Sequence, residues 1–146
     1  MHEPRRTVSW YAIMPAIIAG VAVATPALLH SVPALGFALQ RGFALVCHQQ
    51  AERSFFLFGG SIAVCARCLG IYLGAAAGWS VHVSRRVAMR LLIAVAAVSA
   101  ADWLAELADL HSNWMLVRFT MGIALGTAGA MMVVASLKTP TQAKTA

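Results

Sequence analysis

Three cysteines and a histidine between positions 47 and 68 are the residues of this chain best suited to chemistry. His48 follows Cys47 directly, and Cys65 and Cys68 form a C-x-x-C pair. Three thiols and an imidazole are the Cys3His ligand set of tetrahedral zinc. The same soft donors suit copper(I) or an iron–sulfur centre. The sequence therefore predicts a site for zinc or another thiophilic metal at Cys47, His48, Cys65 and Cys68.

The spacing of these residues sets a geometric condition. Cys65 and Cys68 share a face if they lie on a helix, and the segment 49–64 is short enough to fold Cys47 back onto them. Zinc–thiolate bonds of about 2.3 Å require the three sulfurs to lie within roughly 4 Å of one another. Adjacent residues point apart, so water or Asp102 is an alternative to His48 as the fourth ligand.

Two other interpretations of the cysteines remain open. C-x-x-C is also a dithiol motif, in which Arg67 would lower the pKa of its neighbours and Cys47 would form a mixed disulfide. The architecture then resembles quinone-linked thiol oxidases, although those enzymes need a second cysteine pair and this chain has three cysteines. In the third interpretation the cysteines only pack, in a structural or assembly factor. Leu69 disfavours a c-type haem, because C-x-x-C-H needs histidine there.

Charged residues inside apolar segments are expensive, and they mark functional sites by default. Asp102 lies within one such segment and Arg118 about one turn into the next, while Arg67 lies between the cysteines. We expect Asp102 to pair with Arg118 or Arg67 and these three residues to give the cysteines polar support. Glu106 and Asp109 follow nearer the interface and are predicted to be solvated. The other histidines are predicted to be interfacial or in loops: His2, His30, His82 and His111.

The amino-acid composition indicates the class of protein to which the chain belongs. Apolar residues are 60% of the 146 positions and charged residues are 11%, against about 45–50% and 25% in soluble domains. An integral membrane protein with the lipid bilayer as its partner is expected, and a disordered chain or a coiled coil is excluded. The net charge of +6 is not gathered in one patch, which argues against a nucleic-acid partner. Nucleotide-binding loops and hydrolase motifs are missing from the sequence, so no enzyme class is predicted.

Four apolar segments are long enough to span a bilayer, at 9–29, 59–83, 87–107 and 114–137. They predict an all-α integral membrane four-helix bundle formed by one domain, 1–137, followed by a disordered tail, 138–146. Between the first two spans, Pro33 is expected to begin a short amphipathic or re-entrant helix with Ser31 as its cap.

Basic residues predict the orientation of these spans. Seven of them fall on one side if both termini are cytoplasmic: Arg5, Arg6, Arg85, Arg86, Arg90, Lys138 and Lys144. The segment 30–58 and the cysteines then face the outside or the periplasm. A cleaved secretory signal is the alternative for the first segment, but its apolar run is long for a signal.

Glycines recur every fourth residue in two of the predicted spans. The second span carries Gly70, Gly74 and Gly78, and the fourth carries Gly122 and Gly126. Small residues at this spacing let helix backbones approach closely in lipid. The stripes therefore predict close helix packing and also offer a surface for contact between copies of the chain.

The cysteine region resembles a known family. The motifs are 47–49 (Cys-His-Gln), 52–56 (Glu-Arg-Ser-Phe-Phe), 64–68 (Val-Cys-Ala-Arg-Cys) and 70–74, with Asp102, Arg118, Gly122 and Gly126 as a looser continuation. They are similar to those of small prokaryotic membrane proteins that share the domain of unknown function 2085. Leu69 stands where that family usually carries a small hydroxyl residue. The resemblance implies a multi-pass helical protein of a prokaryotic cytoplasmic membrane, and it implies no particular activity.

Overall fold

The structure of the protein is a computed structural model that describes residues 5–108 and 114–137. The predicted tail 138–146 lies outside the described residues, as do His2, Asp109 and His111. The elements follow in the order α1 (Arg5–Ser31), α2 (Pro33–Ala44), a 3-10 turn η1 (Ala51–Arg53), β1 (Phe56–Leu57), β2 (Gly60–Ser61), α3 (Ala66–Gly78), α4 (Arg85–Leu107) and α5 (Met115–Leu137).

Three of these helices are long and apolar enough to cross a membrane. They are α1 over Trp10–Ser31, α4 and α5, which agrees with the predicted all-α membrane class. The span predicted at 59–83 is different, because its helix α3 has only 13 residues and measures about 20 Å at 1.5 Å per residue. A hairpin and an extended segment occupy 59–65, so the hydrophobic stretch was longer than the helix that it forms.

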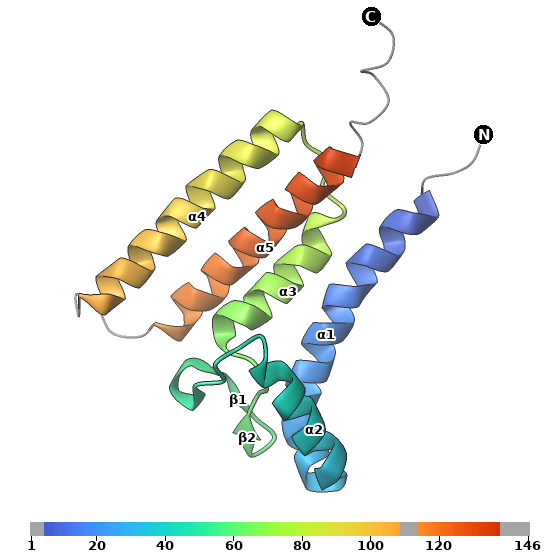
Figure 1. Ribbon diagram of the computed structural model, residues 1–146, viewed down its shortest axis with the longest axis vertical. Coiled ribbons are helices and arrows are strands. Elements are labelled where there is room, and N and C mark those ends of the chain that lie inside the picture. Colours follow the sequence, from blue (N-terminus) through green and yellow to red (C-terminus); the bar gives the residue numbers. More distant parts are fainter. Residues whose placement is uncertain (1–4, 109–113, 138–146) are drawn as a thin grey trace, which may run out of the picture.

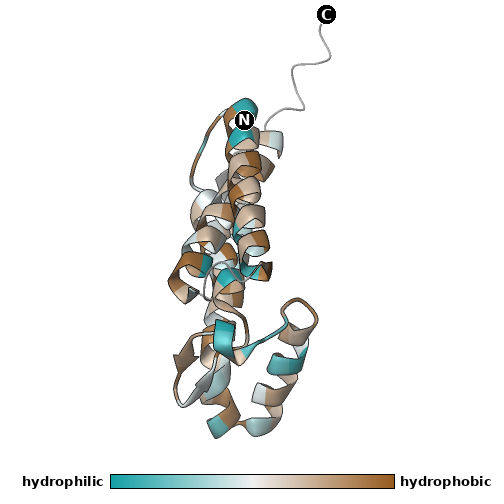
Figure 2. Ribbon diagram, turned by 90° about the vertical axis from the view of Figure 1, so that its left-hand side faces the viewer, coloured by the Kyte–Doolittle hydropathy of each residue, from teal (hydrophilic) through white to brown (hydrophobic). Residues whose placement is uncertain are grey.

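The helices form a row in which α4 packs on α5, α5 on α3, and α3 on α1 (Figure 1). A closed four-helix bundle is therefore not confirmed. Apolar residues predominate along the long helices (Figure 2), and only 6% of the most apolar window of α4 is buried. Such exposure suits lipid, because a hydrocarbon surrounding replaces the protein neighbours that α4 lacks.

The contact between α3 and α5 depends on the two glycine stripes. These helices run parallel, and a Cβ atom at Gly74 or Gly126 would overlap the carbonyl oxygen of Ile123 or Ile71. The Thr127 hydroxyl also donates a hydrogen bond to the Gly74 carbonyl at 3.1 Å. Glycine is required here because the backbones themselves are in contact. The stripes thus face each other within one chain, which confirms the predicted close helix packing.

Helix α2 folds back along the end of α1 (Figure 1). It begins at Pro33, as predicted, because proline needs no hydrogen-bond acceptor in the first turn. The predicted Ser31 cap is wrong, since Val32 is the N-cap and the Ser31 hydroxyl donates instead to the Ala27 carbonyl at 3.0 Å. The turn is tight, and a Cβ at Gly36 would lie 2.6 Å from the Leu29 nitrogen.

A proline in α1 fixes the segment that leads into α3. Pro26 has no N–H, so the Ala22 carbonyl four residues earlier has no helical donor. That carbonyl accepts a hydrogen bond from the Ala63 amide at 3.2 Å. Ile62, Ala63 and Val64 are all buried beside it. The extended approach to α3 is therefore anchored on α1 by a backbone group that the proline releases.

Candidate functional site

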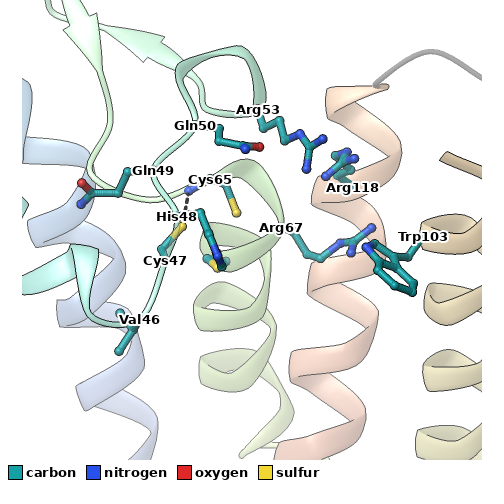
Figure 3. Close-up of a pocket in the computed structure, with 11 residues that line it drawn as sticks. Val46, Cys47, His48, Gln49, Gln50, Arg53, Cys65, Arg67, Trp103 and Arg118 are labelled. Atoms are coloured by element: carbon teal, nitrogen blue, oxygen red, sulfur yellow. Dashed lines mark hydrogen bonds between the residues drawn. The ribbon is translucent and has the colours of Figure 1, made fainter. Parts of the chain in front are cut away.

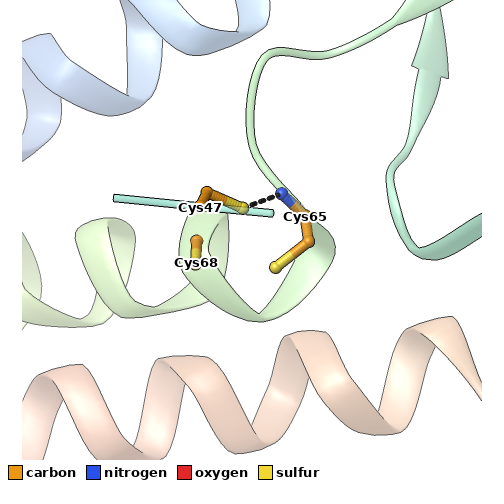
Figure 4. A group of neighbouring side chains, drawn as sticks. All are labelled: Cys47, Cys65 and Cys68. Carbon is orange, nitrogen blue, oxygen red and sulfur yellow. Dashed lines mark hydrogen bonds between the residues drawn. The ribbon is translucent and has the colours of Figure 1, made fainter. Parts of the chain in front are cut away.

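The three cysteines converge at the N-terminal end of α3 (Figure 4). Their sulfur atoms all lie within 4.8 Å of one another, and all three are free thiols. Cys47 is buried, and Cys65 and Cys68 are half-buried. The predicted convergence is confirmed, and its spacing is close to the roughly 4 Å that a tetrahedral thiolate site needs.

The start of α3 places two of the sulfurs on one side. Cys65 is the N-cap residue, with extended backbone, and the helix begins at Ala66. The Cys65 carbonyl accepts the first helical hydrogen bond, from the Leu69 amide at 3.0 Å. Cys68 lies one turn further along, so its sulfur returns to the side of Cys65. The dithiol geometry is therefore a direct consequence of where the helix starts.

Cys47 reaches the pair from the loop that follows α2. Its amide donates to the Phe43 carbonyl at 2.9 Å, which extends the end of α2 by one turn. Its sulfur accepts a hydrogen bond from the Cys65 amide at 3.1 Å. Two segments that are 18 residues apart are thus joined through a thiol and a backbone amide.

Gln49 positions this loop, a role that no sequence pattern indicated. Its side-chain amide donates to the Gln40 carbonyl at 2.7 Å and to the Ala63 carbonyl at 2.8 Å. It therefore ties the end of α2 to the segment that precedes α3. Gln49 also has a φ of +51°, a left-handed conformation that costs about 1 kcal/mol in a non-glycine residue. A pair of glutamines after Cys-His gives no sequence signal for this role.

His48 lies beside the cluster but does not belong to the converging group. It is exposed and lines the same pocket as the three cysteines (Figure 3). Among the described residues, the group that meets the 4.8 Å condition contains the three sulfurs and no imidazole or carboxylate. His30 and His82 are exposed and do not line this pocket.

Ion pairs connect α3, α5 and the loop before β1 to α4. Arg67 pairs with Asp102 at 2.8 Å, which is one of the two predicted partners. Arg118 pairs instead with Glu106, and Arg53 reaches the same carboxylate at 2.9 Å. The prediction that Glu106 is solvated is therefore wrong, because its side chain is only 15% exposed and serves two guanidinium groups.

The thiols and guanidinium groups open onto one pocket of about 400 Å³ (Figure 3). This cysteine–arginine pocket is also lined by two glutamines, a histidine and two apolar side chains, so its members are Val46, Cys47, His48, Gln49, Gln50, Arg53, Cys65, Arg67, Cys68, Trp103 and Arg118. Sequence spacing indicated the thiols, Arg67 and Arg118. The contribution of Arg53 was missed because it lies in a loop far from Arg118 in the sequence.

The thiol of Cys65, which precedes α3, is activated as a nucleophile or ligand. A hydrogen bond from the Cys68 thiol lowers the pKa of Cys65 to about 5, against the opposing effect of burial. Hydrogen bonds from the Cys68 amide, the Cys47 thiol and the Arg67 amide act in the same direction. Cys65 is therefore expected to be a thiolate at neutral pH, the form that binds metals and attacks disulfides.

Apolar helices that end in a pocket of thiols and arginines define a helical membrane protein with a polar site. Residues 47–132 match the family described as "Predicted membrane protein (DUF2085)". This match covers more than half of the chain, which therefore belongs to that family, as its motifs suggested. The matched residues include the three cysteines and both ion-paired partners on α4.

Two archaeal proteins are similar to this chain. An uncharacterized protein of Methanocaldococcus jannaschii is 33% identical over 91 residues, which are 58% of this chain and 58% of that relative. An uncharacterized protein of Methanothermobacter thermautotrophicus is 52% identical over 33 residues, which are 23% of this chain and 30% of that relative. The chain thus spans less than two thirds of the length of either relative. No solved structure matches the chain.

Proposed function

We propose that this membrane protein binds a thiophilic metal ion, zinc before others, through Cys47, Cys65 and Cys68. The observation that carries the proposal is the convergence of three free thiols within 4.8 Å. Packing alone imposes no such convergence on residues that come from two separate segments. Thiolates are preferred ligands of zinc and copper(I).

His48 is the proposed fourth ligand. It lies next to Cys47 and lines the pocket into which the sulfurs open. A rotation of its exposed side chain toward the sulfurs would complete a Cys3His site. If water occupies this position instead, the metal keeps one exchangeable site, which is the arrangement of catalytic zinc centres.

Arg67, Asp102 and Arg118 are proposed as polar support for the metal. Three thiolates around Zn²⁺ carry one net negative charge, and guanidinium groups in the same pocket offset it. Asp102 holds Arg67 in place at 2.8 Å. This role resembles that of the outer partners that orient the ligands in known metal sites.

We propose that the site faces the outside of a prokaryotic cytoplasmic membrane, with both termini in the cytoplasm. Helix α1 begins, α4 begins and α5 ends at one end of the row (Figure 1). Helix α3, whose N-cap residue is Cys65, begins toward the other end. The arginines at the start of α1 and of α4 then follow the positive-inside rule. A reporter fused after Ala146 should be cytoplasmic, and one inserted near Glu52 should be external.

Metal content tests the function directly. Protein purified in a neutral detergent without chelator should contain about one zinc per chain and react slowly with thiol reagents. Each of Cys47→Ser, Cys65→Ser and Cys68→Ser should lose most of the metal, because a three-thiolate site lacks a spare ligand. His48→Ala should weaken binding, whereas His82→Ala, a histidine away from the pocket, should not change it.

A thiol–disulfide function is the second candidate. It is favoured by the position of the C-x-x-C pair at the start of α3 with a third thiol in reach. Metal analysis and thiol titration of the same purified protein distinguish the metal-binding function from the thiol–disulfide function. Metal with three protected thiols supports the first function, and a disulfide with one titratable thiol and no metal supports the second. Three reactive thiols without metal would contradict both and leave a structural role.

A further inference from the structure

The arginine side of the cysteine–arginine pocket has a ligand chemistry of its own. Three guanidinium groups line the pocket, from Arg53, Arg67 and Arg118. No carboxylate is among its lining residues within the described part of the chain. The pocket wall is therefore cationic. The carboxylates that pair with its arginines are not part of this wall.

The acidic residues explain how three like charges stay together. Glu106 pairs with both Arg53 and Arg118, and Asp102, one helical turn away on α4, pairs with Arg67. The two carboxylates thus hold three guanidinium groups from different parts of the chain, which leaves more positive than negative charge in these pairs. The Nε atom of Arg67 is buried and has no hydrogen-bond partner within the described residues.

We propose that this part of the pocket binds a tetrahedral oxyanion, a phosphate group. A phosphate has enough acceptor oxygens for donors that arrive from three elements, whereas a carboxylate has two. The volume of about 400 Å³ fits a small ligand of this kind. Because guanidinium groups and not sulfurs hold the oxyanion, the inference goes beyond the proposed metal site, with which it shares Arg67 and Arg118.

The phosphate can come from solution or from a lipid. An apolar groove of about 410 Å³ lies between α1 and α2, with Tyr72 of α3 on its wall. It shares Val46 with the cysteine–arginine pocket. A phospholipid headgroup among the arginines would therefore have an apolar path nearby for its acyl chain. Free phosphate would leave this groove unused.

Ligand-induced stabilisation tests the proposal. The thermal unfolding midpoint of the chelator-treated protein is measured in a neutral detergent with inorganic phosphate, with dioleoyl phosphatidylglycerol, and with chloride at matched ionic strength and dioleoyl phosphatidylcholine as references. We expect phosphate or phosphatidylglycerol to raise the midpoint by roughly 3 °C or more over its reference. A response to phosphatidylglycerol alone identifies a lipid, and a response to phosphate identifies a free ion. No response to either overturns the proposal.

Single arginine substitutions locate the effect. Arg53→Gln should remove most of the shift, and Arg53→Lys should keep part of it, because lysine retains the charge but not the planar fork. Arg41→Gln is the matched control, since Arg41 is exposed on α2, lies 5.2 Å from the Phe37 ring and does not line the pocket. Equal shifts in Arg53→Gln and Arg41→Gln would overturn the assignment. Metal content of the same variants is measured separately, so a failure of the metal site remains distinguishable.

Discussion

The α3–α5 interface and the cysteine–arginine pocket are built by opposite means, although both use residues of α3. At the interface, glycines bring two backbones into contact, and the Thr127 hydroxyl adds a hydrogen bond to the Gly74 carbonyl. In the pocket, long polar side chains from several elements meet around an open space. The interface fixes the position of α3. Its cysteines and Arg67 are thereby held next to polar side chains from other elements, although like charges repel one another.

The interface is therefore expected to serve mainly the stability of the fold, and the pocket mainly ligand binding. Close packing of small residues is a source of helix association in lipid. Thiolates and guanidinium groups near the ends of membrane helices cost free energy unless they are paired. We therefore expect substitutions at the interface to affect folding first, and substitutions in the pocket to affect ligand binding first.

The largest effect is expected at the interface. In Gly126→Ala, the added Cβ overlaps the Ile71 carbonyl and forces α5 away from α3. We expect a loss of about 3 kcal/mol in the free energy of unfolding, at the upper end of overpacking costs. Gly129→Ala on the same helix is the control, because no atom lies within 4 Å of its Cβ position. Equal unfolding midpoints of the two variants in a denaturing-detergent titration would show that the stripe does not hold the helices together.

The next effect is expected at the ion pairs beneath the pocket. Glu106→Gln removes the negative charge shared by Arg53 and Arg118, and Arg118 is 7% exposed. Loss of the charge should cost about 2 kcal/mol, since a buried cation then lacks its counter-ion. Asp102→Asn should cost less, because Arg67 is more exposed and can turn toward water. If Asp102→Asn unfolds more easily than Glu106→Gln in the same denaturing-detergent titration, the prediction that the less exposed ion pair contributes more to stability is wrong.

A smaller effect is expected where α2 crosses α1. A Cβ in Gly36→Ala would lie 2.6 Å from the Leu29 nitrogen, whereas Gly42→Ala on the same helix meets no atom within 4 Å. The first variant should lose about 1–2 kcal/mol of stability and displace the loop that carries Cys47. Alkylation of Cys47 in metal-free protein, followed by mass spectrometry, should be faster in Gly36→Ala and unchanged in Gly42→Ala. Unchanged alkylation in both would indicate that α2 does not position this cysteine.

Sequence patterns predicted the features that depend on residues close together in the chain. Hydropathy predicted the three long helices, and cysteine spacing predicted the convergence of the sulfurs. Hydropathy overestimated the helical part of 59–83, because apolar residues there also pack in an extended segment beside α1. Charge pairing was only partly predictable. Asp102 and Glu106 lie one turn apart on α4, and the placement of α4 relative to both α3 and α5 decides which arginine each carboxylate meets.

The smallest effect is expected at Gln49, which ties the end of α2 to the segment that precedes α3. Its amide bridges the carbonyls of Gln40 and Ala63, so Gln49→Ala leaves two backbone acceptors without this donor. Water can reach part of this site, and the cost should be about 1 kcal/mol, a typical net value for such hydrogen bonds. The loop with Cys47 then becomes looser, and zinc affinity should fall by up to about fivefold, which is about 1 kcal/mol expressed as a binding constant, while the bound metal per chain stays the same at saturation. Competition with a fluorescent zinc chelator measures this affinity. Gln50→Ala, at the neighbouring exposed residue of the same pocket, is the control. If both variants bind zinc as tightly as the unmodified protein, the loop needs no bridge, and the hydrogen bond between Cys65 and Cys47 is enough to hold the third sulfur.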